Sequence, residues 1–132
     1  MKLLLDTHVW LWLALDPERV SAEVLAQIGR VDTEIYVSVA TLWEVVIKTG
    51  LGKLNLPDPT ETFWQRQTRD SGIVALAIRP EHVLDVAALP HVHRDPFDRL
   101  LVAQARVEGL TLVTADLKVR AYPVATLSAE TS

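Results

Sequence analysis

Short, strongly apolar segments alternate along the chain with longer segments in which apolar residues recur at helical spacing. Apolar or β-branched runs bounded by polar residues or glycine predict strands. We expect strands at 2–5, 34–37, 73–78 and 110–113, and an edge strand at 124–127. Helices are predicted where a capping residue or proline precedes the pattern and glycine or proline ends it. These helices are 7–15, 21–28, 38–49, 60–72, 80–89 and 95–108, with a short helical turn at 119–122.

This alternation of short strands and helices predicts an α/β fold with a mainly parallel central sheet. The chain has 132 residues and no internal repeat or linker rich in Gly, Ser or Pro, so we expect a single domain over residues 1–132. Parallel sheets bind their ligands beyond the carboxyl ends of the strands. Residues that directly follow the strands are therefore the first candidates for a functional site.

Composition excludes several classes of protein. The contents of 49% apolar and 23% charged residues are typical of a folded globular domain. The chain has no cysteine, which excludes disulfide scaffolds, thiolate metal sites and cysteine nucleophiles. No apolar run approaches the ~20 residues that a membrane helix needs, and Asp6 interrupts the apolar start without a signal-peptide cleavage site. We expect a soluble, cytoplasmic protein with no membrane contact.

Two aspartates follow predicted strands. Asp6 comes directly after the strand at 2–5, and Asp116 follows the strand at 110–113. Each is also a good N-cap for the next helix, and for either residue alone the cap is the simpler interpretation. Because both lie at the carboxyl edge of a parallel sheet, the pair indicates a site.

Two further acids lie within predicted helices. Glu44 is surrounded by apolar residues, so its carboxylate must face water, a partner or a cation. An ion pair with Lys48, one turn later, is the structural alternative. Asp98 lies in the first turn of the helix that Asp95 begins, where the helix dipole favours an acid. It can reach the same edge of the sheet as the two strand-end aspartates.

Four carboxylates without any cysteine suggest a hard divalent cation, Mg²⁺ or Mn²⁺, held by oxygen ligands. Without an ion, such a cluster would repel itself. The formal net charge of −4 comes from 17 acidic and 13 basic residues. Setting the four acids aside leaves thirteen acids against the thirteen bases, so the acidic composition does not argue against a nucleic-acid substrate.

The order Asp, Glu, Asp, Asp on an α/β pattern resembles a PIN domain. More narrowly, it resembles the VapC-type ribonuclease toxins of toxin–antitoxin pairs. The resemblance extends from residue 3 to about residue 122 and rests on five stretches in the family's order. They are 4–8 (LLDTH), 38–44 (SVATLWE), Lys48 with 50–54 (GLGKL), 93–105 (HRDPFDRLLVAQA) and 112–116 (LVTAD).

The resemblance implies a three-layer α/β/α fold and an endoribonuclease that depends on Mg²⁺ or Mn²⁺. It also implies an RNA substrate and a VapB-type antitoxin as partner. Thr114 matches a Ser or Thr that supports water at the family's metal site. The middle of the chain, 55–90, departs from the pattern, which leaves the choice of substrate open. The family's metal-binding and catalytic acids match Asp6, Glu44, Asp98 and Asp116.

Other polar residues lie near these acids in the sequence. Lys48, Arg94 and Arg99 are candidate contacts for RNA phosphates, with solvated or salt-bridged surface charge as the alternative. Asp95 is expected to cap a helix, and His93 to form a hydrogen bond near the site. The two neighbouring histidines, His91 and His93, have no third ligand at the spacing of zinc sites, so no zinc site is expected.

Two functions of other classes stay open. An acidic-pocket protein without catalysis would act only through its partner, although the intact set of acids argues against it. A phosphoreceiver domain has a similar size and fold, but no acidic pair precedes Asp6 and no late lysine is well placed. Calorimetry with Mg²⁺ would test the first alternative, and labelling of Asp6 by acetyl phosphate would test the second.

The first predicted helix carries seven consecutive apolar residues, 9–15. Because a helix turns by about 100° per residue, this run covers the whole circumference, and the sheet can cover only one side. We therefore expect Trp10 and Trp12 at the interface of a homodimer. We also expect an amphipathic antitoxin helix to cover this helix or its neighbours and to place a basic side chain in the acid cluster.

Overall fold

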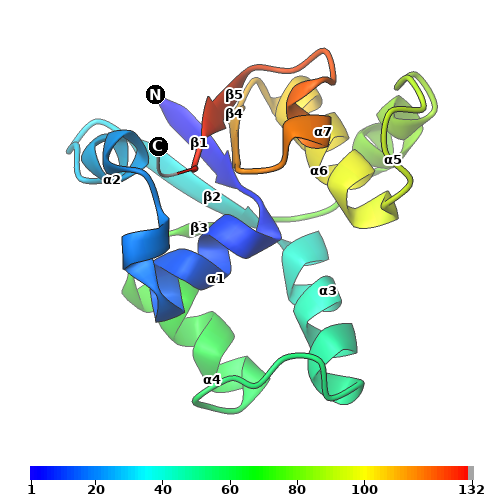
Figure 1. Cartoon of the computed structure of the whole chain (residues 1–132). Coiled ribbons are helices and arrows are strands. Elements are labelled where there is room, and N and C mark those ends of the chain that lie inside the picture. Colours follow the sequence, from blue (N-terminus) through cyan, green and yellow to red (C-terminus); the bar gives the residue numbers. More distant parts are fainter. Residues whose placement is uncertain (131–132) are drawn as a thin grey trace.

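Five parallel strands form the centre of the computed structural model, which describes residues 1–130 (Figure 1). The order across the sheet is β3-β2-β1-β4-β5, and each neighbouring pair is parallel. In the central strand, Leu5 is in register with Val37 on one side and Val113 on the other. The strands are β1 Lys2–Leu5, β2 Glu34–Ser38, β3 Val74–Leu76, β4 Thr111–Thr114 and β5 Thr126–Ser128.

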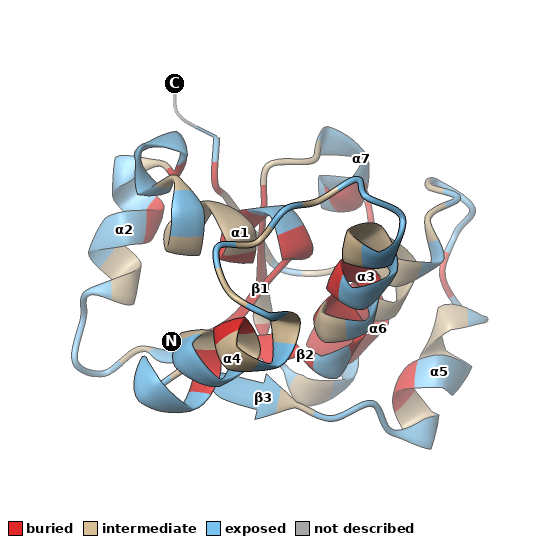
Figure 2. Cartoon of the chain, turned by 90° about the horizontal axis from the view of Figure 1, so that it is seen from below, coloured by how far each residue is buried: buried red, intermediate tan, exposed pale blue. Residues whose placement is uncertain are grey.

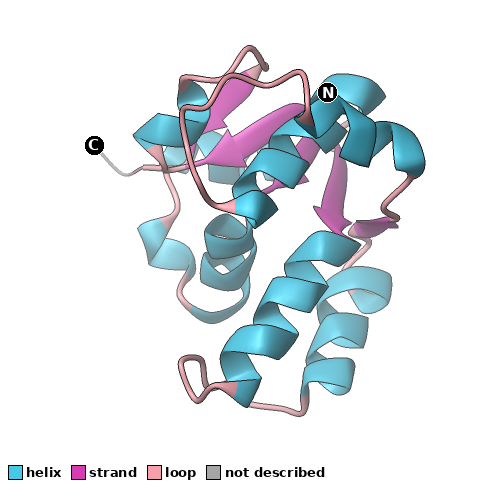
Figure 3. Cartoon of the chain, turned by 90° about the vertical axis from the view of Figure 1, so that its right-hand side faces the viewer, coloured by secondary structure: helices cyan, strands magenta, loops and turns pink. Residues whose placement is uncertain are grey.

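Helices cover both faces of the sheet and complete a three-layer α/β/α arrangement (Figure 3). One face carries α1, α2 and α4, the other carries α5, α6 and α7, and α3 extends from the carboxyl end of β2. Among residues 1–130, none of these helices is long and apolar enough to cross a membrane. Their bounds are α1 Thr7–Leu15, α2 Ala22–Ile28, α3 Val39–Gly50, α4 Thr60–Gln65, α5 Pro80–Val86, α6 Pro96–Glu108 and α7 Leu117–Arg120.

The side chains of β1 divide between two hydrophobic cores. Leu3 and Leu5 point into the core under α1 and α4, which contains Trp10. Leu4 points the other way, into the core under α6, and packs with Leu101. All three leucines are fully buried, so β1 is covered on both faces (Figure 2). A continuous apolar run of this kind is typical of a strand in a parallel sheet.

The predicted α/β fold class is confirmed, and the sheet is parallel at every pairing within residues 1–130. Several boundaries differ from the prediction. The helix expected at 60–72 is α-helical only as far as Gln65, and Arg66–Asp70 form a π-helical turn. The strand expected at 73–78 is only three residues long, because β3 is an edge strand that pairs with β2 alone.

Trp10 is a core residue, so its predicted place at a dimer interface is wrong. Its side chain is 1% exposed, and its ring packs edge-on against Phe63 (5.3 Å between centroids) and Trp64 (5.6 Å). The sheet covers one side of α1 and α4 covers a second side, which the apolar pattern did not predict. Trp12 is half-buried, and the guanidinium of Arg19 lies 4.6 Å from its ring centroid.

Candidate active site and metal centre

The carboxyl ends of β1 and β4 bring Asp6 and Asp116 to the same edge of the sheet. The two strands are neighbours, and the backbone N–H of Asp6 donates to the carbonyl of Val113 (3.0 Å). Here the chain order reverses, since β2 and β3 extend from one side of β1 while β4 and β5 extend from the other. Such a switch point leaves the crevice in which open α/β sheets bind ligands.

Both of these aspartates also cap helices. Oδ1 of Asp6 accepts from the N–H of Val9 in α1 (2.8 Å), and Oδ1 of Asp116 accepts from the N–H of Lys118 in α7 (2.8 Å). A cap of this kind uses one carboxylate oxygen. Oδ2 of Asp116 lies instead 3.3 Å from Nε2 of His93. The cap and the site are therefore compatible roles, and the cap fixes how each carboxylate is oriented.

The N-terminus of α6 supplies Asp98. Oδ1 of Asp95 accepts from the backbone N–H groups of Phe97 (2.8 Å) and Asp98 (3.3 Å), so Asp95 is the N-cap of α6. One turn of helix then turns Asp98 toward the other acids. Its burial and the repulsion by neighbouring carboxylates raise the pKa of Asp98 to about 7. These neighbours are Asp95, Asp6, Glu44 and Asp116.

Thr114 connects the two strand-end aspartates. Asp6 is 5% exposed, and this burial raises the pKa of its carboxyl, while hydrogen bonds from the Thr114 hydroxyl and the N–H of Val9 partly offset the effect. Thr114 is fully buried, and its Oγ1 accepts from the backbone N–H of Asp116 (3.0 Å). The hydroxyl therefore donates to one acid and fixes the backbone of the other.

Glu44 reaches the cluster from α3 and is 6% exposed. Its Oε1 accepts from the hydroxyl of Thr7 (2.7 Å), and its Oε2 pairs with Nζ of Lys48 (2.7 Å). The ion pair proposed as the structural alternative is thus present, and the same carboxylate also repels Asp98. The part played by Thr7 was not predicted, although its place directly after the first strand-end acid was an available signal.

His93 lies between two of the acids. Its Nε2 is 3.2 Å from Oδ2 of Asp98 and 3.3 Å from Oδ2 of Asp116. Its Nδ1 accepts from the N–H of Asp95 (3.3 Å), which places the proton of the neutral imidazole on Nε2, toward the carboxylates. The hydroxyl of Tyr122 accepts from the backbone N–H of His93 (2.8 Å) and donates to its carbonyl (3.2 Å). The imidazole therefore turns both carboxylates toward one point.

The three predicted phosphate contacts fall into two groups. Lys48 and Arg94 line a groove of about 420 Å³ beside the acids. The guanidinium of Arg99 donates instead to the backbone carbonyls of Pro90 (2.8 Å) and Val86 (3.1 Å). Arg99 therefore fixes the segment before α6, and its contact with an RNA phosphate stays a prediction.

Comparison with known proteins identifies the family of this chain. The PIN domain family profile matches residues 3–124. The chain belongs to the PIN domain family. It is also 30% identical over 120 residues to Ribonuclease VapC22 of Mycobacterium tuberculosis, an alignment that covers 90% of each protein.

Solved structures share the fold of this PIN domain. A chain of VapBC2 from Rickettsia felis, bound to a DNA fragment from their promoter, superposes with a TM-score of 0.73 at 17% identity, over 98% of this chain and 100% of that one. A chain of DNA-bound VapBC from Salmonella typhimurium gives 0.67 at 17% identity, over 97% and 98%. At this level of identity the likeness concerns the fold alone.

The donor set of this PIN domain fits the Mg²⁺ or Mn²⁺ that the resemblance implies. The carboxylate oxygens are hard ligands of the kind these ions prefer. Ligand atoms of His93, Asp98 and Asp116 all lie within 4.8 Å of one another, and no other group of three potential ligands in residues 1–130 does so. Burial and like-charge repulsion together raise the pKa of Asp98, and a cation would relieve the repulsion.

In the absence of divalent ions, we expect the protein to lose stability as the pH rises from about 4 to 7. The pKa of Asp98 is about 7 in the folded protein, against an ordinary value of 3.8. Between these values the folded state keeps a proton that the unfolded chain has released, and stability then falls with pH. Because the side chain is 22% exposed, we expect a loss of about 2 kcal/mol, roughly half of the full linkage value.

Urea unfolding in EDTA at pH 4.5 and 7.5 measures this loss. Asp98→Asn removes the main titrating group and should weaken the dependence on pH to the part that the raised pKa of Asp6 contributes, whereas Asp70→Asn, at an exposed ion pair with Arg69, should keep the wild-type dependence. Mg²⁺ should restore stability at pH 7.5 in the wild type. An unchanged pH dependence in Asp98→Asn would assign the effect to another group.

Proposed function

We propose that this PIN domain is an endoribonuclease that uses Mg²⁺ or Mn²⁺, and that it is the toxin of a VapBC-type toxin–antitoxin pair. The observation that carries the proposal is the convergence of four carboxylates, from two strand ends and two helices, at one edge of the sheet. The 30% identity to Ribonuclease VapC22 along most of the chain supports RNA as the substrate. The four acids are Asp6, Glu44, Asp98 and Asp116.

The four carboxylates would hold the ion, which when bound supplies positive charge that stabilises the phosphate during hydrolysis. The chain's own residues set the orientation of this site. Thr7 and Lys48 fix Glu44 from two sides, and Thr114 joins the two strand-end acids. His93 turns the remaining carboxylate oxygens toward one point. Such rigid positioning is what catalysis by charge stabilisation requires.

An antitoxin would occupy a second hollow beside the same acids. This hollow has a volume of about 270 Å³ and is lined by Asp6, His8, Trp12, Ala115 and Asp116. It combines two carboxylates with the half-buried indole of Trp12, which suits an amphipathic helix that carries a basic side chain. The VapB-type antitoxin proposed here would therefore block the metal ligands directly.

A homodimer stays part of the proposal, and burial removes Trp10 but not Trp12 from its candidate surface. Residues 7, 9 and 10 of α1 are buried, and residues 11–14 are half-buried within the protomer. Exposed apolar side chains lie also on α3 and α5, where a second copy would have apolar surface to cover. They include Val39, Trp43, Val46, Val83 and Leu84.

Cleavage of RNA by the purified protein, free of any antitoxin, tests this function. End-labelled RNA should be cut with Mg²⁺ or Mn²⁺ present, and EDTA should stop the reaction because the carboxylates alone supply no positive charge. RNA that stays intact with both ions would contradict the proposal. An inactive interaction module would show that result together with antitoxin binding, whereas a phosphoreceiver would be labelled by acetyl phosphate.

A further inference from the structure

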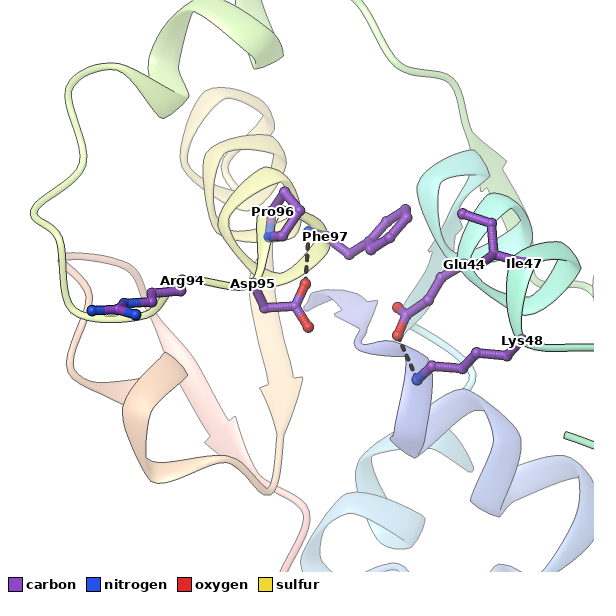
Figure 4. A pocket seen from close by; sticks show the side chains of 7 residues that line it. All are labelled: Glu44, Ile47, Lys48, Arg94, Asp95, Pro96 and Phe97. Carbon is purple, nitrogen blue, oxygen red and sulfur yellow. Dashed lines mark hydrogen bonds and ion pairs between the residues drawn. The ribbon is translucent and has the colours of Figure 1, made fainter. Parts of the chain in front are cut away.

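A groove of about 420 Å³ opens between α3 and α6, directly beside the acid cluster (Figure 4). Its size is in the range of about 300–1,000 Å³ that is typical of small-ligand sites. The apolar part of its lining is formed by Ile47, Pro96 and Phe97. Glu44 belongs both to the groove wall and to the acid cluster. A ligand in the groove would therefore lie next to the point of cleavage.

Phe97 presents an aromatic ring to this groove. The side chain is only half-buried, and Figure 4 shows it projecting from α6 toward α3. Trp43 supports the ring from α3, with 5.1 Å between the centroids and an angle of 72° between the planes. A fixed and accessible aromatic ring is the surface on which proteins stack unpaired bases of single-stranded RNA.

The polar groups on the inner wall are mainly hydrogen-bond acceptors. Figure 4 shows the carboxylates of Glu44 and Asp95 facing each other across the groove. Both hydrogen bonds of the Asp95 carboxylate within residues 1–130 go to Oδ1, so Oδ2 can accept from a ligand. Adenine, cytosine and guanine offer an exocyclic amino group to such an acceptor, whereas uracil offers a carbonyl at the corresponding position of cytosine.

Two cations complete the groove. Lys48 lies on its wall, and Arg94 is exposed and extends outward at its rim (Figure 4). They would meet the phosphates on either side of a bound base. An apolar protein partner would bury the charges of Arg94 and Asp95 without compensating them, which is costly. A nucleotide combines a flat apolar base with an anionic phosphate and so matches both parts of the lining.

We propose that this groove binds one unpaired RNA base next to the cleaved phosphodiester, with Phe97 as the stacking surface and Asp95 as the acceptor for an amino group. The proposal rests on the proposed ribonuclease function and adds to it the residues that select the RNA. Phe97 is thus a specificity-determining residue, and the groove favours amino-bearing bases over uracil.

Binding without cleavage tests the proposal. Wild-type protein with Mg²⁺ first maps a cleaved site, and short labelled RNAs around that site are then bound to Asp98→Asn in EDTA and measured by fluorescence anisotropy. Each position is replaced in turn by an abasic nucleotide. We expect one position beside the cleaved bond at which loss of the base weakens binding about tenfold. Adding Phe97→Ala should reduce that effect to less than about twofold, and Phe97→Tyr should preserve it.

A second comparison tests the acceptor. At the sensitive position, cytosine should bind about tenfold more tightly than uracil, because the amino group donates to a charged acceptor. Asp95→Asn keeps the helix cap through its one amide oxygen, since asparagine caps as well as aspartate, and this places the NH₂ donor where Oδ2 of the aspartate faces the ligand. This variant should therefore lose the preference for cytosine and favour uracil, whose carbonyl accepts from the amide. A preference for cytosine that persists in Asp95→Asn would remove Asp95 from the site.

Two controls separate stacking from folding. Phe97→Leu keeps apolar bulk against Trp43 but removes the aromatic face, so it should lose the base effect while its melting temperature stays near that of the wild type. Leu25→Ala changes an exposed leucine on α2 and should leave binding unchanged. Equal weakening of intact and abasic RNA by Phe97→Ala would overturn the base site.

The remaining outcomes distinguish the two proposals. If the wild type cuts RNA but no position depends on Phe97, the base site fails and the ribonuclease function stands. If no RNA is cut with either metal ion, the proposed function fails and the base site fails with it. If sedimentation shows that Phe97→Ala converts a dimer into a monomer, a second copy of the chain covers the groove and the base site is overturned.

Discussion

Asp6→Asn and Asp98→Asn are each expected to lower RNA cleavage by at least about 100-fold while the protein stays folded. Removing a residue that only supports a metal ligand lowers metal affinity or activity by up to about 100-fold, so loss of a proposed ligand should lower cleavage by at least as much. Folding should survive because asparagine caps α1 as well as aspartate does. A neutral side chain at position 98 also removes the buried charge and the like-charge repulsion that raise the pKa of Asp98. Cleavage rates with Mg²⁺ measure the loss of activity, and thermal melting in EDTA measures whether the variants stay folded.

Asp70→Asn is the matched control for these variants. Its side chain is 61% exposed and pairs with Arg69 at 3.8 Å, so the same chemical change should leave cleavage within about twofold of the wild type. The metal assignment would be wrong if either test variant cut RNA at the wild-type rate. Melting of either variant well below the wild type in EDTA would contradict the expected relief of repulsion.

The central part of the fold could be predicted because local and non-local preferences agree there. The leucine run of β1 is buried on both faces, as its lack of alternation indicated. Ser38 and Asp95 cap α3 and α6, and Gly109, with φ of 69°, ends α6 in the left-handed conformation that glycine favours. The length of β3 could not be predicted, because it depends on pairing with β2 rather than on its own sequence.

The acids of the site could be located because topology places strand ends at one edge. Their surroundings depend on contacts between distant segments and gave no local signal. Tyr122 holds the backbone of His93 across 29 residues, and Arg99 is satisfied by carbonyls of the segment before α6. Charge and proximity in the sequence cannot show that a guanidinium already has partners, which is why the structural role of Arg99 was not predicted.

The first helix shows where the apolar pattern stops being informative. A helix that is apolar all round is covered on every side, but the pattern does not say whether the cover is the same chain or a partner. Here α4 covers Trp10 through Phe63 and Trp64. The nine residues that connect α3 to α4 have no apolar periodicity that would indicate this contact. Trp12 is two positions along the helix and therefore faces another direction.

This difference predicts effects of different size for the same substitution, tryptophan to alanine, at the two positions. Trp10→Ala should lower the free energy of unfolding by about 3–5 kcal/mol, because it leaves a large cavity beside Phe63 and Trp64 in a tightly packed core. Trp12→Ala should cost about 1 kcal/mol, because its ring is half-exposed and loses mainly the contact with Arg19. Urea titrations followed by circular dichroism, with unchanged m-values, give both numbers. Equal costs at a protein concentration where the chain is monomeric would contradict the burial of Trp10 within the protomer. A cost at position 10 that grew with protein concentration would return this residue to the interface at which the apolar pattern first placed it.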